Sequence, residues 1–507
     1  MSTQTGTANQ PDIPPGEILG HPKALWQLSN IEMWERFAYY GMRALLAVYV
    51  ATTFFGHLGD QANAEASLVY GGYTALVYAT GIIGGYIADH VLGYQRSILL
   101  GAIIMAAGLF VLLIEDLTWF LVGLSLIVAG NGLFKPNIST MIGKLYAPGD
   151  VRRDSGFTIF YMGINLGALI APAITASWIG ATWGLKWGFF AAALGMVLST
   201  LFLEVAKRSL GHVGLPPKGN EGWGRFFLVG LGALVMAIGV FFLLSASTVL
   251  GYLLVGIMAA LIAYFIISGI KSGDRVQLQR YIAMIILFAA NACFWALFEQ
   301  AGSSMNFFAR EFVTPIFGSM ETWQAGGFGI FQSLNPLYIL LFAPLFAAFW
   351  PWLDKRNINP SIPRKFALGL IQVALGFYIL VFAIANFQNA AGLVPWIFLA
   401  LCYLLHTTGE LCLSPIGLSM VTKLAAEKET GMAMGGWFLS IAMAQYVAGI
   451  IAAIASGGTS DGHGPVVGAT ITQYSDTYWM LFLIGLGFGI VYLVVAPLIN
   501  KLMHGVK

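Results

Sequence analysis

Residues 30–43 read NIEMWERFAYYGMR, and they run directly into the apolar stretch LLAVYVATTFF. The segment has the apolar density of a membrane helix, yet it carries Glu32, Glu35, Arg36 and Arg43. A charge at the centre of a bilayer is costly, so such a group faces protein or a water-filled cavity and usually has a task. Because three- and four-residue steps share one face of a helix, the four side chains form one polar stripe. The stripe predicts a functional helix inside a membrane protein.

The composition of the whole chain indicates a polytopic membrane protein. Of its 507 residues 58% are hydrophobic and 9% are charged, and the mean hydropathy is +0.78. A soluble globular chain has about 25% charged residues. The net charge of +2 comes without a basic run, so nothing favours nucleic acid as a partner. The three cysteines all lie in apolar segments, and their odd number argues against a disulfide framework.

Hydrophobic segments long enough to cross a bilayer recur along the chain. About 20 apolar residues suffice for a transmembrane helix. On that measure the sequence predicts fourteen spans, at 30–55, 68–89, 97–114, 118–142, 156–179, 184–203, 225–244, 249–269, 280–302, 326–350, 365–387, 394–420, 434–456 and 478–502.

The distribution of Lys and Arg predicts the orientation. With the N-terminus in the cytoplasm, 20 of the 25 basic residues fall on the inner side, and Lys186 and Arg310 alone fall on the outer side. The other three, Arg36, Arg43 and Lys135, lie within spans. An error of one span would destroy this asymmetry, so it supports both the span count and cytoplasmic termini.

The spans group as six, two and six. We expect a cytoplasmic N-terminal tail (1–28), a six-helix bundle (29–203), a cytoplasmic linker (204–224), an extra helix pair with its loop (225–279) and a second six-helix bundle (280–507). Six plus six with an insert is the arithmetic of a major facilitator transporter, in which the substrate site lies near mid-membrane between the halves. The predicted fold is therefore an all-α integral membrane protein with twelve core helices and two extra ones.

Other predicted spans also carry polar residues at helical spacing. The sets are Asn131, Lys135 and Ser139; Asn291, Trp295 and Glu299; His406, Glu410 and Ser414; and single residues Asn165 and Asn335. Four acids and three bases inside spans suit a zwitterionic substrate together with a proton. Simpler interpretations stay open at this point: a snorkelling Lys135, an interfacial Trp295, a structural Arg43–Glu299 ion pair and a His406 that only packs.

Several motifs resemble one family of major facilitators. The segment from Glu32 to Tyr40 has the pattern ExxERFxYY and resembles the first-helix signature of proton-dependent oligopeptide transporters. GGYIADHVLGYQRSI (84–98), FYMGINLG (160–167) and GELCLSPIGLSM followed by GGWFLS resemble further segments of that family. The resemblance covers essentially the whole chain. The extra helix pair resembles prokaryotic members, which implies a bacterial inner membrane.

The resemblance implies proton-driven import of di- and tripeptides by alternating access, with the peptide termini clamped between the bundles. Protons would be the coupling ion, no cofactor or metal is expected, and we expect a monomer. Proton coupling is implied for Glu32, Glu35, Arg43, Lys135 and Glu299, with Arg43 paired to Glu299. Substrate contact is implied for Arg36, Tyr39, Tyr40, Tyr78, Lys135, Tyr161, Asn165, Trp295, Asn335, Glu410, Ser414, Trp437 and Phe438.

One departure from the family concerns the second span. Some relatives carry a histidine there, where this chain has Gly71 or Gly72. The carboxylates would therefore carry the proton, with His406 a further titratable candidate.

Alternatives to peptide import are a same-fold transporter of another anion or zwitterion, such as nitrate or an amino-acid conjugate, and a drug exporter. A channel or a non-transporting sensor is a further alternative. An enzyme is disfavoured because the seven histidines are scattered and no Ser-His-Asp set or metal cluster is seen.

Overall fold

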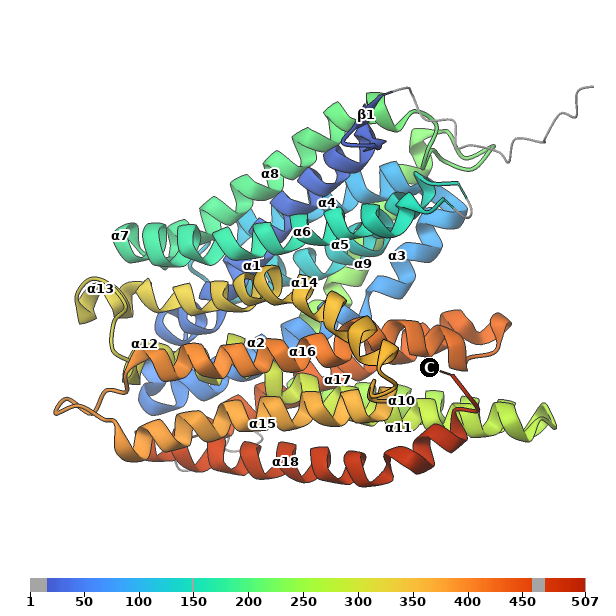
Figure 1. Ribbon diagram of the computed structural model, residues 1–507. Helices are drawn as coiled ribbons and strands as arrows, with labels where there is room; N and C mark the ends of the chain where they lie inside the picture. The colour runs from blue at the N-terminus through green and yellow to red at the C-terminus, as the bar shows by residue number, and fades with distance from the viewer. Residues whose placement is uncertain (1–15, 148–149, 458–469, 507) are drawn as a thin grey trace, which may run out of the picture. The chain divides into compact units, whose positions relative to one another are not determined.

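The structure is a computed structural model, and it describes residues 16–147, 150–457 and 470–506 (Figure 1). Among these residues the regular secondary structure is helical, apart from the two-residue strands β1 (Glu17–Ile18) and β2 (His21–Pro22) and an isolated bridge between Val313 and Val394. The earlier helices are α1 Lys23–Thr53, α2 Ala62–Ala79, α3 Gly81–Ile87, α4 Tyr94–Val111, α5 Leu117–Lys144, α6 Arg152–Pro172, α7 Ala181–Trp183, α8 Leu185–Leu210, α9 Trp223–Ser245 and α10 Ser247–Lys271. The later ones are α11 Arg275–Phe298, α12 Ser304–Phe312, α13 Met320–Ala325, α14 Leu334–Lys355, α15 Ile362–Asn386, α16 Trp396–Leu424, α17 Thr430–Ala455 and α18 Ile471–Leu502.

Short irregular helical segments join or extend these helices. Four are 3₁₀ turns, η1 Gly56–Gln61, η4 Glu299–Gly302, η5 Gly327–Ser333 and η6 Glu427–Glu429, and two are π-helical, η2 Ala88–Leu92 and η3 Ala173–Gly180.

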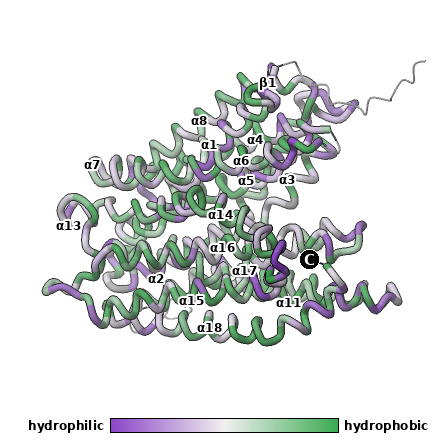
Figure 2. Tube along the Cα trace, in the orientation of Figure 1, coloured by the Kyte–Doolittle hydropathy of each residue, from purple (hydrophilic) through white to green (hydrophobic). Residues whose placement is uncertain are grey.

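Within the described residues, 13 helical segments are long and apolar enough to cross a membrane. They correspond one to one with thirteen of the fourteen predicted spans. The fourteenth is α1, whose charged stripe lowers its apolar content below that of the others. Figure 2 shows apolar residues along the length of helices such as α15 and α18. The prediction of an all-α membrane protein is confirmed.

The helix α1 begins at Lys23, earlier than the predicted start at residue 30. Its first turns are held by apolar burial, since Ala24, Leu25 and Leu28 are almost fully buried. It therefore takes up part of the segment that the sequence suggested was a tail, and β1 and β2 form a small antiparallel hairpin just before it. Residues 1–15 of that tail lie outside the described residues.

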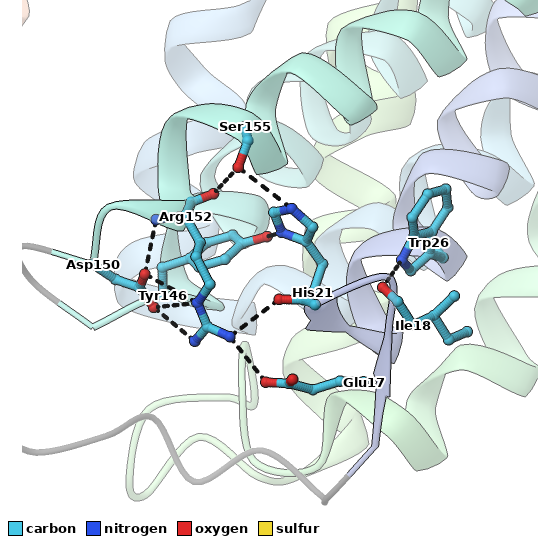
Figure 3. A network of polar contacts seen from close by, with 9 residues as sticks. Glu17, Ile18, His21, Trp26, Tyr146, Asp150, Arg152 and Ser155 are labelled. Carbon is cyan, nitrogen blue, oxygen red and sulfur yellow. Dashed lines mark hydrogen bonds and ion pairs between the residues drawn. The ribbon is translucent and has the colours of Figure 1, made fainter.

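The N-terminal hairpin is held by a polar network (Figure 3). Arg152, at the start of α6, donates to Glu17 at 2.9 Å, to the Gly20 carbonyl at 3.1 Å and to Asp150 at 2.9 Å. The His21 ring contacts the Tyr146 hydroxyl at 2.8 Å. The hydrogen bonds from Arg152 hold the pKa of the Asp150 carboxyl below its usual range, and burial raises the pKa of Tyr146 to about 12.

The chain divides into two compact units. Unit 1 comprises residues 1–42, 80–175 and 186–242, and unit 2 comprises 43–79, 176–185 and 243–507. The division falls inside α1, between Met42 and Arg43. The bundle boundaries predicted from the sequence stay predictions.

In unit 1, α4 and α5 pack at backbone distance through glycines. A Cβ at Gly101 would lie 2.6 Å from the Gly130 carbonyl oxygen, and one at Gly108 would lie 2.7 Å from that of Gly123. In a membrane the hydrophobic effect does not drive helices together, because lipid tails are as apolar as the side chains. Helices associate through close packing instead, which small residues permit. The contact keeps α5, which carries Lys135, firmly placed.

In unit 2, α2 packs on α17 in the same way, although the two helices are far apart in the sequence. A Cβ at Gly71 would lie 2.7 Å from the Gly449 Cα. Thus α2, which was predicted to belong to the first bundle, packs against α17, which was predicted to belong to the second bundle. Gly71 is one of the two positions, with Gly72, where some relatives were expected to carry a histidine, and at Gly71 this contact leaves no room for one.

A partly buried carboxylate, Glu429, holds the extra helix α10 to the rest of unit 2. It accepts hydrogen bonds from Ser268 at 2.6 Å and Tyr264 at 3.1 Å, both on α10, and from Tyr281 on α11. The residue stands in η6, directly before α17. The carboxylate therefore joins three helices at one point.

Candidate functional site

In unit 1, the α1 side chains Glu32, Glu35 and Arg36 form a buried cluster of charges. Arg36 donates through Nη2 to Glu35 Oε1 at 2.7 Å and its Nε also contacts Glu35 Oε2, while the same Nε lies 3.2 Å from Glu32 Oε1. The three side chains are 3% exposed or less. Helical spacing explains the Glu32–Arg36 contact, which joins residues one turn apart.

The cluster carries more negative than positive charge at its centre. One guanidinium serves two carboxylates, and among the described atoms Glu32 Oε2 has no hydrogen-bond partner. The Lys135 ammonium on α5 is close enough to interact electrostatically with Glu32. A buried, partly unsatisfied carboxylate is costly when charged, so this group is suited to take up and release a proton.

Two tyrosine rings lie beside the same cluster, and α6 carries a buried amide and an exposed phenol. The Arg36 Cζ lies 5.1 Å from the Tyr39 ring centre and 6.0 Å from that of Tyr40. On α6, the buried Asn165 donates to the Tyr161 carbonyl at 2.9 Å, and the Tyr161 side chain is 43% exposed. Unit 1 therefore supplies one buried guanidinium, the half-buried ammonium of Lys135 and an exposed phenol.

In unit 2, Arg43 forms an ion pair with Glu299, and the side chains are 11% and 2% exposed. The Arg43 Nε donates to the Tyr70 hydroxyl, and the guanidinium carbon lies 5.9 Å from that ring centre. Glu299 stands where α11 gives way to η4, and the next residue, Gln300, donates to the Ala448 carbonyl at 3.1 Å. The ion pair thus sits at a helix break that a hydrogen bond to α17 holds in place.

A second acidic site in unit 2 joins α14 to α16. Asn335 donates from one amide nitrogen to Glu410 Oε2 at 2.9 Å and to the Thr407 hydroxyl at 3.1 Å. Glu410 is half-buried, and Ser414 follows one turn later on the same helix, also half-buried. The arrangement orients a carboxylate that makes no ion pair with any described residue.

The predicted aromatic residues divide into two groups by environment. Trp437 is 3% exposed and lies with its ring centre 6.2 Å from that of Phe288. Trp295 is 9% exposed, and its indole nitrogen has no hydrogen-bond partner among the described atoms. Tyr78 and Phe438 are half-buried. Trp437 is built into the helix packing in this state, whereas the indole of Trp295 keeps an unused donor.

His406 is a packed residue in this structure. Its Nε2 lies 3.0 Å from the Val373 carbonyl, and its ring centre lies 4.9 Å from that of Phe377. A Cβ at Gly376 would meet the ring at 2.6 Å, so the imidazole fills a slot left by that glycine. These contacts favour the packing interpretation of His406.

Two polar partners, Tyr70 and Thr407, were not predicted from the sequence. Tyr70 lies in a mainly apolar span and is 1% exposed, and its hydroxyl meets both Arg43 and Gly302. Thr407 stands directly beside the singled-out His406 but shares the amide of Asn335. Only its place three residues before Glu410, on the same helix face, could have indicated it.

No group of three or more His, Cys, Asp or Glu residues able to hold a metal occurs in the described part of the chain. The three cysteines are free, and Cys402 and Cys412 are buried.

Comparison with known proteins identifies relatives along the full length. The chain is 37% identical to the uncharacterized transporter YclF of Bacillus subtilis, over 97% of both chains. It is 36% identical to the peptide transporter YePEPT of Yersinia enterocolitica, over 89% of this chain and 90% of the relative. A solved peptide transporter POT in complex with sulfate superposes with a TM-score of 0.80 at 35% identity, over 97% of this chain and 98% of that one.

The fold predicted from the sequence is confirmed by this superposition. Residues 95–480 match the model of the POT family, more than half of the chain. The chain therefore belongs to the POT family of membrane transporters.

Proposed function

We propose that this protein is a proton-coupled symporter that imports di- and tripeptides. The observation that carries the proposal is the buried cluster of Glu32, Glu35 and Arg36, in which two carboxylates share one guanidinium and Glu32 Oε2 is unsatisfied. Such a group binds a proton readily, and its charge state depends on what else is near the cluster. The relatives named as peptide transporters support the substrate class.

The charged groups predicted from the sequence suit the two ends of a peptide. In the proposal Arg36 and Lys135 bind the peptide carboxylate, and Glu410, oriented by Asn335, binds the ammonium. Asn165 is a further contact. Because both termini are recognised by charge, the side chains can vary. Aromatic rings accept side chains of different size through their area.

Proton coupling follows from competition for the same carboxylates. Glu299 is paired with Arg43 in this structure, and we propose that it is protonated in another state of the cycle. We propose that the protonation of Glu32 and Glu35 depends on Lys135 in the same manner. The proton is the only coupling species in the proposal, and no cofactor takes part.

We place the protein in a bacterial inner membrane as a monomer with both termini in the cytoplasm. The asymmetry of Lys and Arg supports the orientation, and the bacterial relatives support the compartment.

The test is uptake of labelled dialanine into proteoliposomes with and without an inward proton gradient. Gradient-driven accumulation that other dipeptides abolish, and free alanine does not, is the expected result. Glu299→Gln should lose accumulation and keep peptide exchange across the membrane, and Glu204→Gln, on an exposed helix face, should keep both. Full accumulation by Glu299→Gln would refute its coupling role.

Another small zwitterion is the second candidate substrate. A POT family transporter solved in complex with 5-aminolevulinic acid superposes with a TM-score of 0.79 at 30% identity. That molecule also presents an ammonium and a carboxylate. If it competes with dialanine and is itself accumulated, the substrate class is wider than peptides; if dialanine is not accumulated at all, the peptide proposal fails.

A further inference from the structure

A cavity of about 520 Å³ lies in unit 1 where α5 ends and α6 begins. Its lining includes the cations of Lys144 and Arg153, and none of the described residues that line it is acidic. The hydroxyls of Ser139 and Thr140 also face it, but they donate to the carbonyls of Lys135 and Pro136 one turn earlier on α5. A cavity lined by two positive charges favours an anion as its occupant.

The cavity continues the helix faces that carry the proposed substrate contacts. On α5, Lys135, Ser139 and Gly143 follow one another at four-residue steps, and the last two line the cavity. On α6, Arg153 and Phe157 line it, and Tyr161 follows Phe157 by four residues. Four helical residues rise about 6 Å, so the cavity begins one turn from Lys135.

Arg153 differs from its neighbour Arg152 in its hydrogen bonds and ion pairs. Arg152 is held by Asp150, Glu17 and the hairpin backbone (Figure 3). The guanidinium of Arg153 makes no hydrogen bond or ion pair with any described residue, and its Cζ lies 5.8 Å from the Phe157 ring centre.

The position of the Arg153 guanidinium depends on a glycine. A Cβ at Gly143 would lie 3.3 Å from Arg153 Nη2, so the missing side chain lets the cation rest against α5. Lys144 lies with its Nζ 4.5 Å from the Tyr94 ring centre. Both cations are therefore placed by aromatic rings, which leaves their hydrogen-bond donors for an anion.

We propose that this cavity is a second, weaker site for the carboxylate of a transported peptide, occupied as the peptide moves from Lys135 toward the cytoplasm. Arg153 and Lys144 bind the carboxylate. A carboxylate released from Lys135 then meets another cation after a short step. The inference rests on the proposed peptide transport and on the cytoplasmic placement of this end of α5.

The test uses a Ser139→Cys reporter in a Cys293→Ser background, purified in neutral detergent. Its reaction with an anionic and a cationic methanethiosulfonate reagent is timed with increasing dialanine. Relative to their rates with a free thiol in solution, the anionic reagent should react about fivefold faster than the cationic one, since a unit charge roughly 8 Å away in water changes each local concentration about twofold. Dialanine should slow the reaction.

Arg153→Gln should abolish the reagent preference and raise the half-protecting dialanine concentration about fivefold, the scale of one solvated charge contact. Arg208→Gln, which removes an exposed cation elsewhere in unit 1, should change neither. Equal protection in the two variants would mean that dialanine acts only by closing the protein, and it would overturn the site.

Protection by lipid and uptake by the parent protein are measured as well, so that failure of this site can be distinguished from failure of the proposed function. If added phosphatidylglycerol protects the reporter and dialanine does not, the cavity holds a lipid phosphate and the inference is wrong. If the parent protein fails to accumulate dialanine in proteoliposomes, the proposed function fails. If the parent accumulates dialanine but Arg153→Gln leaves protection unchanged, this site alone is refuted.

Discussion

Removing either partner of the Arg43–Glu299 ion pair should destabilise the protein more than removing both. The two side chains are 11% and 2% exposed, so solvent screens the pair very little. A buried charge left without its partner typically costs about 3–5 kcal/mol. Arg43→Gln leaves a buried carboxylate, and Glu299→Gln leaves a guanidinium whose Nε still donates to Tyr70. We therefore expect the arginine substitution to cost more at pH 8.

The double variant should recover part of the loss, because two neutral amides can hydrogen-bond to each other. A coupling free energy of about 2–4 kcal/mol is expected from the four proteins of the cycle. The assay is equilibrium unfolding in mixed micelles titrated with SDS, followed by circular dichroism.

The matched control is the exposed pair of Lys186 and Glu115, 3.1 Å apart and 39% and 57% exposed. Its cycle should give at most about 1 kcal/mol. A coupling energy for Arg43 and Glu299 no larger than the control value would refute the reasoning from burial.

Three further outcomes follow from the packing and the polar networks. Gly449→Ala should lower the free energy of unfolding by about 1–3 kcal/mol, because its methyl would meet the α2 backbone at 2.8–2.9 Å, and Gly487→Ala, with nothing within 4 Å, is the control in thermal unfolding. Glu429→Gln should cost about 1–2 kcal/mol and speed hydrogen exchange at the end of α10, since three hydroxyls lose a charged acceptor; unchanged exchange would contradict this. The pKa of Asp150 is lowered by Arg152, so its stabilisation of the hairpin is complete above the ordinary carboxyl pKa of about 4 and is lost as the pH falls through the lower folded value. Proteolysis of the hairpin across that range checks this, with Asp150→Asn expected to be sensitive already at pH 7.

The span pattern could be predicted because membrane burial leaves a strong signal in the sequence. Long apolar runs and the placement of Lys and Arg gave thirteen spans that the structure matches, and helical spacing placed Glu32 beside Arg36. The start of α1 was less accessible. Its first turns contain polar residues as well as buried Ala24 and Leu25, so no uninterrupted apolar run marks them.

Contacts between distant segments could not be predicted from periodicity. The hydroxyl of Tyr70 and the backbone at Gly302 meet across more than two hundred residues, and nothing in either local sequence names the other. The sequence also does not show which of two adjacent residues forms an ion pair. Arg152 and Arg153 are the same residue type, yet Arg152 is bound to the hairpin and Arg153 lines a cavity.

The extra helix pair has a consequence for protein engineering. Most of α9 belongs to unit 1 and α10 to unit 2, and Ala246 alone separates the two helices. The pair is therefore not a cassette that can be excised whole. Deleting it would remove a helix from each unit, and with α10 would go Ser268 and Tyr264, two of the three residues that donate hydrogen bonds to Glu429. A minimal transporter built by splicing residue 222 to 275 would need both exposed faces redesigned.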